Sequence, residues 1–240
     1  MKQLLFILLV VTVGMGCFAQ PGKKSIYDGF GDTDKKPKVN ALYVGPVVGA
    51  TMTMASGQPD QYDVFDGAGI GFSGGVAARA RFGKATVNSH EGSGAFGVEL
   101  DLKYNLHSVK TNAADNLSLG YIEIPVMAQY YPLAKTATGN GFYIEAGADF
   151  AMLMSKSPDI LRIELNEPYP GLQAVEYSTG DLKGGDIRAA VGIGYILPQK
   201  GLGINARYYV GMSDLSKNAL PTKLNTVELS LSWMFKVLTF

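Results

Sequence analysis

The feature that most constrains this chain is a strict alternation of side-chain chemistry with a period of two. From 67 to 82, apart from Gly74, the even positions are alanine or larger apolar residues, whereas the odd positions are glycine, serine, alanine or arginine. From 96 to 106, phenylalanine, valine, leucine and tyrosine hold the even positions, and small or polar residues hold the odd ones. This period is typical of β-strands with two chemically different faces. The sequence therefore predicts a sheet rather than a helical bundle.

Six more segments repeat this alternation at lengths that suit a membrane crossing. They lie near 41–54, 119–131, 141–154, 186–197, 202–213 and 226–236. Strands of soluble sheets average about five or six residues, whereas a tilted transmembrane strand needs about 9 to 11. The eight segments within 40–240 predict an all-β fold, an eight-stranded antiparallel up-and-down transmembrane β-barrel. Pro46 and Pro125 fall inside predicted strands, so we expect a bulge or a strand edge at each.

The alternation alone fits either a membrane barrel with an apolar outside or a soluble lipocalin-like barrel with an apolar ligand cavity. The apolar positions of the predicted strands contain no Asp, Glu, Lys or Arg. A water-facing surface would be rich in such side chains, whereas a lipid-facing surface excludes them. The opposite face is crowded with glycine, alanine and serine, which fit the narrow inside of a small barrel. We therefore expect the apolar face to contact outer-membrane lipid.

The opposite face also carries charges of both signs that nearly balance. The predicted inward-facing charges are Arg79, Arg81, Glu99, Asp101, Lys103, Glu123, Glu145, Asp149, Asp186, Arg188, Arg207, Glu228 and Lys236. Buried charges need partners, so we expect an ion-pair network that fills the barrel, with a charged channel lining as the alternative. The antiparallel count places Arg79 opposite Glu99. A similar count places Lys103 beside Glu123.

Aromatic residues in the apolar positions gather at one end of the predicted strands. They are Phe82, Phe96, Tyr130, Phe142, Tyr195 and Phe235. Aromatic girdles mark the level where a membrane barrel meets water, so we expect these side chains to form one at a single rim.

The connections between the strands differ in length. The turn at 198–201 is tight, whereas 155–185 is long, polar and contains three prolines. Short turns belong at the periplasmic end of such barrels and long loops outside the cell. We expect 155–185 to be the main extracellular loop and the likeliest partner-binding surface, because loops on rigid scaffolds carry recognition.

The N-terminal residues indicate export. A basic start, an apolar run from 4 to 13 and small residues before Gln20 predict a cleavable signal peptide over 1–19. The polar stretch 20–39 is predicted to be a flexible periplasmic tail. Lipidation of Cys17, the single cysteine, is the alternative. Cleavage after 19 would leave a mature chain without cysteine, and so without disulfides or thiolate metal sites.

Several function classes lack support in the sequence. The balance of 21 basic and 21 acidic residues argues against a nucleic-acid partner. The G-x-G-x-x-G spacing at 69–74 lies within a continuing strand and not before a helix, so it does not predict a dinucleotide site. His90 and His107 are predicted in solvated loops without a carboxylate cluster, so we expect no metal and no cofactor. The spacing of His107, Ser108 and Asp115 fixes no nucleophile–base geometry, so we expect no enzyme.

Three motifs resemble a known group of proteins. They are Tyr121–Tyr131, Ala206–Asp214 and Val227–Phe235. Over about 40–240 the chain is similar to the small PorT-like, porin-family outer-membrane barrel proteins. The resemblance implies an eight-stranded barrel in a Gram-negative outer membrane. It also implies a link to protein secretion, and so to other envelope or secretion proteins as partners.

Three functional hypotheses follow from these observations. The first is a filled barrel that acts as an anchor or interaction partner through its extracellular loops, linked to secretion. The second is a narrow porin-like channel for small solutes. The third is an enzyme at the outer rim.

Overall fold

The strands of this protein are long and follow one another antiparallel along the chain. The structure is a computed structural model that describes residues 40–56, 65, 67–82, 96–111, 116–134, 141–169, 172–197, 201–215 and 222–239. The predicted signal peptide and tail lie outside these residues. The strands are β1 (Ala41–Ser56), β2 (Gly69–Phe82), β3 (Phe96–Val109), β4 (Leu117–Tyr130), β5 (Phe142–Ser157), β6 (Ile160–Tyr169), β7 (Leu172–Ser178), β8 (Gly185–Ile196), β9 (Leu202–Gly211), β10 (Lys223–Trp233) and β11 (Phe235–Thr239).

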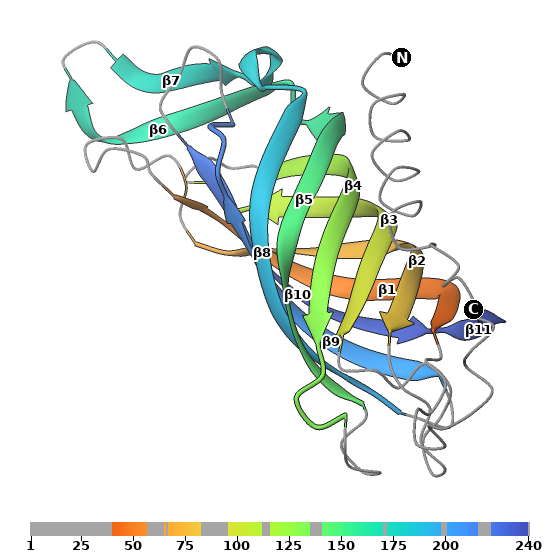
Figure 1. Ribbon diagram of the computed structural model, residues 1–240. Coiled ribbons are helices and arrows are strands. Elements are labelled where there is room, and N and C mark those ends of the chain that lie inside the picture. The colour runs from red at the N-terminus through yellow and green to blue at the C-terminus, as the bar shows by residue number, and fades with distance from the viewer. Residues whose placement is uncertain are drawn as a thin grey trace, which may run out of the picture. The chain divides into compact units, whose positions relative to one another are not determined.

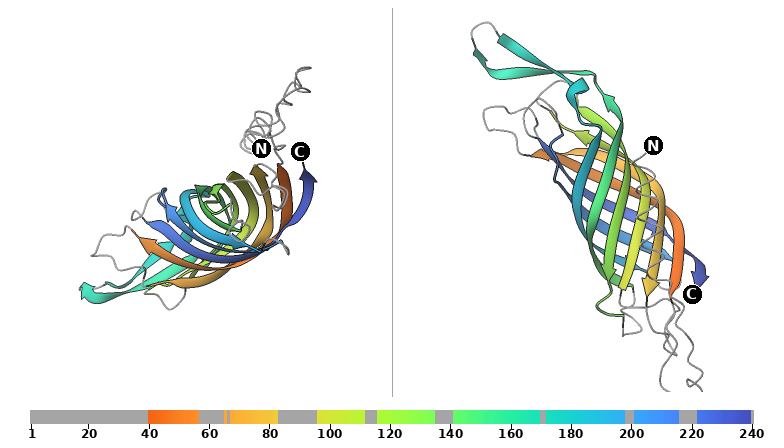
Figure 2. Two further views of the ribbon diagram at one scale, coloured as in Figure 1. Left: turned by 60° about the horizontal axis from the view of Figure 1, so that its bottom comes forward. Right: turned by 45° about the horizontal axis from the view of Figure 1, so that its top comes forward.

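Eight of these strands form a closed antiparallel barrel, which confirms the predicted fold class (Figures 1 and 2). The order around the wall is β10, β9, β8, β5, β4, β3, β2 and β1, and pairing of β1 with β10 closes it. The closing ladder runs from Val47 opposite Ser232 to Ser56 opposite Lys223. Beyond Met234, β11 pairs only with the start of β1. No helix among the described residues is long and apolar enough to span a membrane.

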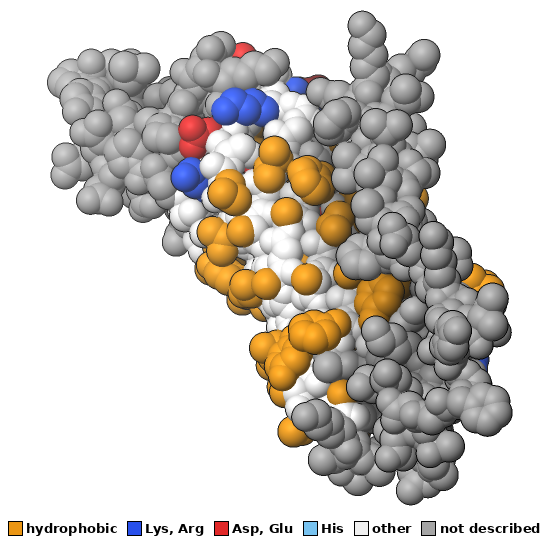
Figure 3. All heavy atoms as spheres, viewed as in Figure 1, with side chains coloured by type: hydrophobic (Ala, Val, Ile, Leu, Met, Phe, Trp, Pro, Cys, Tyr) orange, Lys and Arg blue, Asp and Glu red, His pale blue; other side chains and the backbone are white. Residues whose placement is uncertain are grey.

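The two faces of the wall differ as the period of two predicts. Outward positions are exposed and apolar, for example Ile70 at 80%, Leu229 at 58% and Val191 at 53%. Figure 3 shows such side chains as a band around the middle of the visible wall, with charged groups above it. Inward positions are buried and mainly polar or charged. The barrel therefore exposes an apolar surface to its surroundings and encloses its charges.

The two ends of the barrel are distinguished by their connections. We call the end at which β1 begins the turn end, and the end at which β5 leaves for β6 the hairpin end. At the hairpin end β6 and β7 form a separate two-stranded sheet, from Ile160 opposite Ser178 to Tyr169 opposite Leu172. This hairpin lies within 155–185, which the sequence predicted as a loop. Alternating apolar and polar residues on both sides of Pro170 and Gly171 provide its pattern.

The prolines within strands interrupt single ladders but do not shift the register. On β4, Pro125 pairs with Asp149 of β5, whereas the β3 ladder skips from Val126 to Glu123. On β1, Pro46 pairs with Val76, and the ladder on its other side is interrupted where β10 gives way to β11. Proline has no N–H to donate, so a gap suffices where we had expected a bulge or a strand edge.

Beside Pro46, β1 approaches the junction of β10 and β11 so closely that only glycine fits. A Cβ added at Gly45 would lie 1.8 Å from the backbone oxygen of Trp233 and 2.9 Å from the Cα of Met234. Both contacts are with backbone atoms, so relief requires the closing strands to move apart. Gly74 lies in the same wall and has no atom within 4 Å of its added Cβ.

We predict that Gly45→Ala destabilises the barrel by about 1–3 kcal/mol or more, the usual cost of forcing extra atoms into a packed site. Gly74→Ala is the matched control and should leave stability unchanged within about 0.5 kcal/mol. Urea unfolding in lipid vesicles, followed by fluorescence of the single tryptophan, measures both. Equal midpoints for the two variants would contradict this account of the closure.

Candidate functional site

The barrel interior gathers most of the charges that the sequence placed on the inward face. Each of these side chains is at most 8% exposed. They are Arg79, Arg81, Glu99, Asp101, Lys103, Glu123, Glu145, Asp149, Asp186, Arg188, Arg207 and Glu228. Since burial of an unpaired charge is costly, their partners decide what the interior can do.

Arg207 of β9 is the centre of the network towards the turn end. Its guanidinium donates to Glu145 of β5 and to Glu99 of β3, each at 2.5 Å, and to Asp101 of β3. Glu99 also accepts from Arg79 of β2 at 2.5 Å. One arginine thus holds carboxylates from strands on other parts of the wall, so it crosses the interior rather than following one ladder.

Arg188 of β8 is the second centre, towards the hairpin end. Its Nη2 donates to Glu123 of β4 and to Asp149 of β5. Its Nε lies 3.8 Å from Asp186, whose other oxygen accepts from the Ser213 hydroxyl. The described interior therefore contains two arginine centres, each surrounded by three carboxylates.

Lys103 lies between these centres and contacts the opposite part of the wall. Its Nζ is 2.6 Å from Glu228 of β10 and 3.1 Å from the hydroxyl of Tyr209. The predicted register is confirmed, because Lys103 is paired with Glu123 and Arg79 with Glu99. The cross-strand neighbour of Lys103 is nevertheless not its ion-pair partner. A long side chain can reach across the lumen, and strand register alone does not reveal that.

Neutral polar side chains complete the network, and the sequence interpretation did not select them. Gln129 donates to Glu99 at 3.2 Å and to Glu145 at 2.9 Å. Asn205 donates to Glu145 at 2.8 Å and to the Tyr143 hydroxyl at 2.9 Å. All occupy inward positions of their strands, so the same alternation could have identified them.

Aromatic rings lie in the interior at the turn end. Arg81 lies 3.8 Å from the ring centre of Tyr131, and Arg79 lies 5.2 Å from that of Tyr143. The two tyrosine rings are 5.3 Å apart. These cation–π contacts place large side chains across the lumen below the Arg207 centre.

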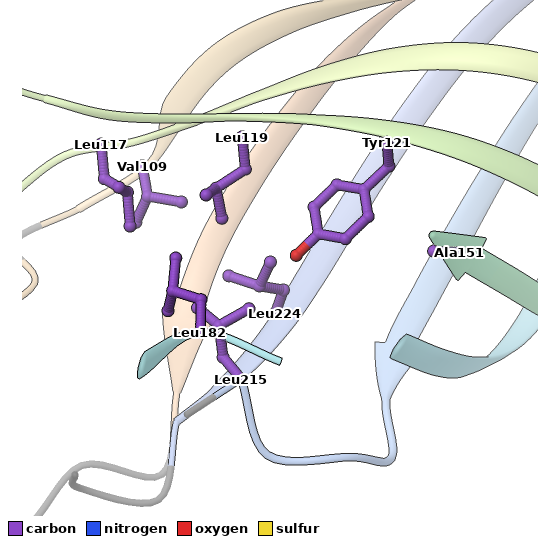
Figure 4. Close-up of a cluster of buried hydrophobic side chains, with 8 residues drawn as sticks. All are labelled: Val109, Leu117, Leu119, Tyr121, Ala151, Leu182, Leu215 and Leu224. Carbon is purple, nitrogen blue, oxygen red and sulfur yellow. The ribbon is translucent and has the colours of Figure 1, made fainter. Parts of the chain in front are cut away.

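An apolar cluster fills the interior at the hairpin end (Figure 4). Its members are Val109, Leu117, Leu119, Tyr121, Ala151, Leu182, Leu215 and Leu224. Leu182 and Leu215 come from the connections outside the wall strands, which are joined by a 2.8 Å hydrogen bond from the Lys183 amide to the Leu215 carbonyl. The sequence interpretation expected a polar lining throughout and missed this cluster, although six of its eight members lie at inward positions of the wall strands.

The predicted girdle residues lie at the turn end on the outward face. Phe96 pairs with Tyr130, with ring centres 5.4 Å apart, and Phe142 pairs with Tyr195. Phe82 pairs with Phe96. Trp233, which we had assigned only to the apolar face, has its ring 5.3 Å from that of Phe235.

Two residues lie where the sequence interpretation did not place them. Lys236 is exposed rather than inward-facing, because it belongs to β11, which continues past the β10–β9 pairing and contacts only β1. His107 is fully buried in β3 rather than solvated in a loop. Its Nε2 is 2.7 Å from Glu123 Oε1, and its Nδ1 is 2.8 Å from Thr53 Oγ1. His90 lies outside the described residues.

The rim-enzyme arrangement is not assembled around His107. Ser108 follows it on the outward face of β3, because successive residues of a strand point to opposite sides. The hydroxyl that His107 does contact, Thr53, is fully buried, as is Glu123. Asp115 lies outside the described residues. Among the residues that the structure describes, no group of three or more His, Cys, Asp or Glu could hold a metal ion.

Comparison with known proteins agrees with a membrane barrel. Residues 18–217 match the family described as the outer membrane protein beta-barrel domain. The chain belongs to this family. The protein is therefore a small barrel of the outer membrane, and its apolar outer wall is in contact with lipid. No curated protein matches the sequence.

Three solved structures illustrate what the chain is similar to. Neisserial surface protein A has 14% identity and a TM-score of 0.41, and the match covers 81% of this chain and 97% of that one. Ail, the attachment invasion locus protein of Yersinia pestis, has 15% identity and a TM-score of 0.38, covering 80% and 98%. OprG of Pseudomonas aeruginosa has 11% identity and a TM-score of 0.36, covering 85% and 98%.

We predict that Arg207→Met lowers the unfolding free energy by about 3–5 kcal/mol, because it leaves buried carboxylates without their cation. Lys110→Met removes an exposed cation from the hairpin end and should change stability by no more than about 0.5 kcal/mol. Urea unfolding in lipid vesicles compares the two variants. An Arg207→Met barrel as stable as the parent protein would show that the network contributes nothing to folding.

Proposed function

We propose that this protein is a closed outer-membrane anchor that binds a partner through its extracellular segment. The observation that supports this proposal is the burial of large side chains inside the barrel along its described length. Three layers of side chains follow one another along the barrel axis from the turn end to the hairpin end. They are the tyrosine pair Tyr131 and Tyr143, the two arginine centres, and the apolar cluster. Because side chains of the protein occupy the interior, the surfaces that could bind a partner are those outside the membrane.

Within the predicted loop 155–185, the part between the end of β5 and the start of β8 is 158–184, and it contains the β6–β7 hairpin. We assign the extracellular role to this segment. The hairpin forms its own sheet and is not part of the barrel wall (Figure 1). An isolated two-stranded hairpin is only marginally stable in water, so binding that buries it would stabilise it. A rigid barrel below supplies the fixed base that recognition by a loop requires.

The resemblance to PorT-like barrels supports one class of partner. The motifs at 121–131, 206–214 and 227–235 resemble those of PorT-like barrels, whose namesake is tied to a protein-export system. This resemblance favours another envelope or secretion protein as the partner. We propose no enzymatic activity, since the His107 environment offers a substrate no access.

A narrow channel for small solutes is the second candidate function. The small inward residues Gly71, Gly147 and Ser73 favour it, because they leave more room than large side chains would. Ser73, however, donates a 2.7 Å hydrogen bond to Glu228, and an added Cβ at Gly147 would lie 2.0 Å from a neighbouring backbone oxygen. The space beside these small residues is thus already used.

We predict that the purified protein in a planar lipid bilayer shows no steady conductance. An eight-stranded barrel is just wide enough to be filled by its own side chains, and opposed charges here hold one another across it. Stable, ion-selective steps that vanish in Arg207→Ala or Glu228→Ala would overturn the closed barrel and favour the channel.

We predict that protease added to intact cells cleaves within 158–184. An epitope tag inserted between β6 and β7 should bind antibody on intact cells. The same tag inserted within 198–201, the segment that the sequence predicts as a tight turn, should bind only after the outer membrane is opened. The opposite pattern would invert the topology and remove the hairpin from the cell surface.

Replacing 160–178 with a short Gly-Ser linker should keep the barrel folded and abolish co-purification of the cross-linked partner.

A further inference from the structure

The described interior holds more negative than positive charge. Its buried cations are the four arginines at 79, 81, 188 and 207 and the lysine at 103, whereas seven carboxylates are buried with them. His107 lies within hydrogen-bond distance of Glu123 and Thr53. Among the described residues, the buried carboxylates thus outnumber the buried arginines and lysine by two and have to share them. Burial of two uncompensated charges in a lumen without bulk water would be very costly.

The hydrogen bonds distinguish two of the seven carboxylates from the rest. Asp101 Oδ1 and Asp149 Oδ1 are buried and have no hydrogen-bond partner among the residues that the structure describes. Each of these side chains contacts an arginine through its Oδ2 alone, Arg207 for Asp101 and Arg188 for Asp149. At the other five, each oxygen is bonded or lies within ion-pair distance of a cation, as at Glu99 with Oε1 to Arg207 and Oε2 to Arg79.

The two aspartates lie at matching positions on both sides of one proline. Asp149 of β5 is paired with Pro125 of β4. On the other side, the ladder of β3 and β4 skips the positions between Leu100 and Lys103, which places Asp101 level with the same proline. The proline side chain is an apolar ring without a donor. The inward-facing neighbour at this level therefore offers neither aspartate side chain a hydrogen bond.

We propose that Asp101 and Asp149 are a pair of proton-binding sites within the membrane-spanning barrel, each carrying a proton at neutral pH. The proton resides on the oxygen that lacks a donor, and the other oxygen still accepts from arginine. A neutral carboxylic acid costs far less to bury than a carboxylate. Two bound protons also balance the two surplus carboxylates, so the charge count and the hydrogen bonds lead to the same pair.

The groups that face each aspartate determine how it holds its proton. Asp101 faces Glu99, Arg207 and Lys103, and the glutamate already satisfies much of the positive charge of that arginine. Asp149 faces Arg188, Glu123 and Lys103, with Glu123 sharing the guanidinium in the same way. Lys103 is itself engaged with Glu228 at 2.6 Å. The nearby cations are thus committed to other carboxylates.

Infrared spectroscopy of the purified barrel in an ester-free detergent tests the proposal directly. A protonated carboxylic acid has a carbonyl stretch separate from that of a carboxylate. The parent protein should show two buried carboxylic-acid components at neutral pH, of which Asp101→Asn removes one and Asp149→Asn the other. Absence of any change in both variants would overturn the proposal.

Stability measurements provide a second readout with matched controls. An amide closely resembles a neutral carboxylic acid, so Asp101→Asn and Asp149→Asn should leave the urea midpoint unchanged or raise it. Glu145→Gln and Glu123→Gln neutralise carboxylates with both oxygens bonded, so they should lower it. A lowered midpoint in the aspartate variants, as large as in the glutamate variants, would show that Asp101 and Asp149 are charged.

The dependence on pH separates protons from bound metal cations. The unfolded chain releases aspartate protons above about pH 4 while the folded barrel keeps them, so rising pH lowers the stability contribution of the pair. The parent protein should therefore lose stability relative to the Asp101→Asn, Asp149→Asn double variant as pH rises from about 4 to 7. A different result would show that a metal cation, and not a proton, balances the charge. The urea midpoint of the parent protein would then depend on sodium or potassium concentration, that of the double variant would not, and no carboxylic-acid band would appear. This result would overturn the proposal.

Discussion

Arg207 and Arg188 each bring carboxylates from different strands to one point inside the barrel, and the register of the wall depends on those contacts. A buried ion pair is weak evidence for net stability, because desolvation offsets much of its attraction. Loss of one partner is strongly destabilising, because it leaves the remaining buried charges without a counter-charge. The network therefore selects one register among the possible ones, because a slip by one residue would turn every inward charge towards lipid.

The outer wall and the two ends surround the charge network with apolar and aromatic side chains, which strengthens its ion pairs. Lipid-facing positions such as Ile70 carry no charge, and Tyr131 and Tyr143 lie across the turn end. At the hairpin end, Leu182 and Leu215 bring apolar side chains from the connections over the lumen. Low local dielectric strengthens the ion pairs and raises the cost of leaving any group without a partner. The buried charge network and the separate hairpin are the features on which our proposal of an anchor rather than a pore rests.

The period of two was sufficient to predict the strand number, the two faces and the pairing of Arg79 with Glu99. It could not predict that Lys103 binds Glu228, because that contact crosses the lumen between strands far apart in the sequence. It also placed His107 in a loop, because strand ends are the least certain part of any such prediction. Alternation also says nothing about Leu182 and Leu215, which lie outside the wall strands and complete the apolar cluster.

Whether the lumen is closed to water can be measured at single side chains. In a Cys17→Ser background, cysteines at Thr51 and Ser230, which are 2% and 4% exposed and face inward, should not react with a small water-soluble methanethiosulfonate reagent. A cysteine at Lys110, exposed at the hairpin end, should react rapidly in the same preparation. Inner cysteines that react as fast as the one at 110 would show an open, water-filled lumen and contradict the account.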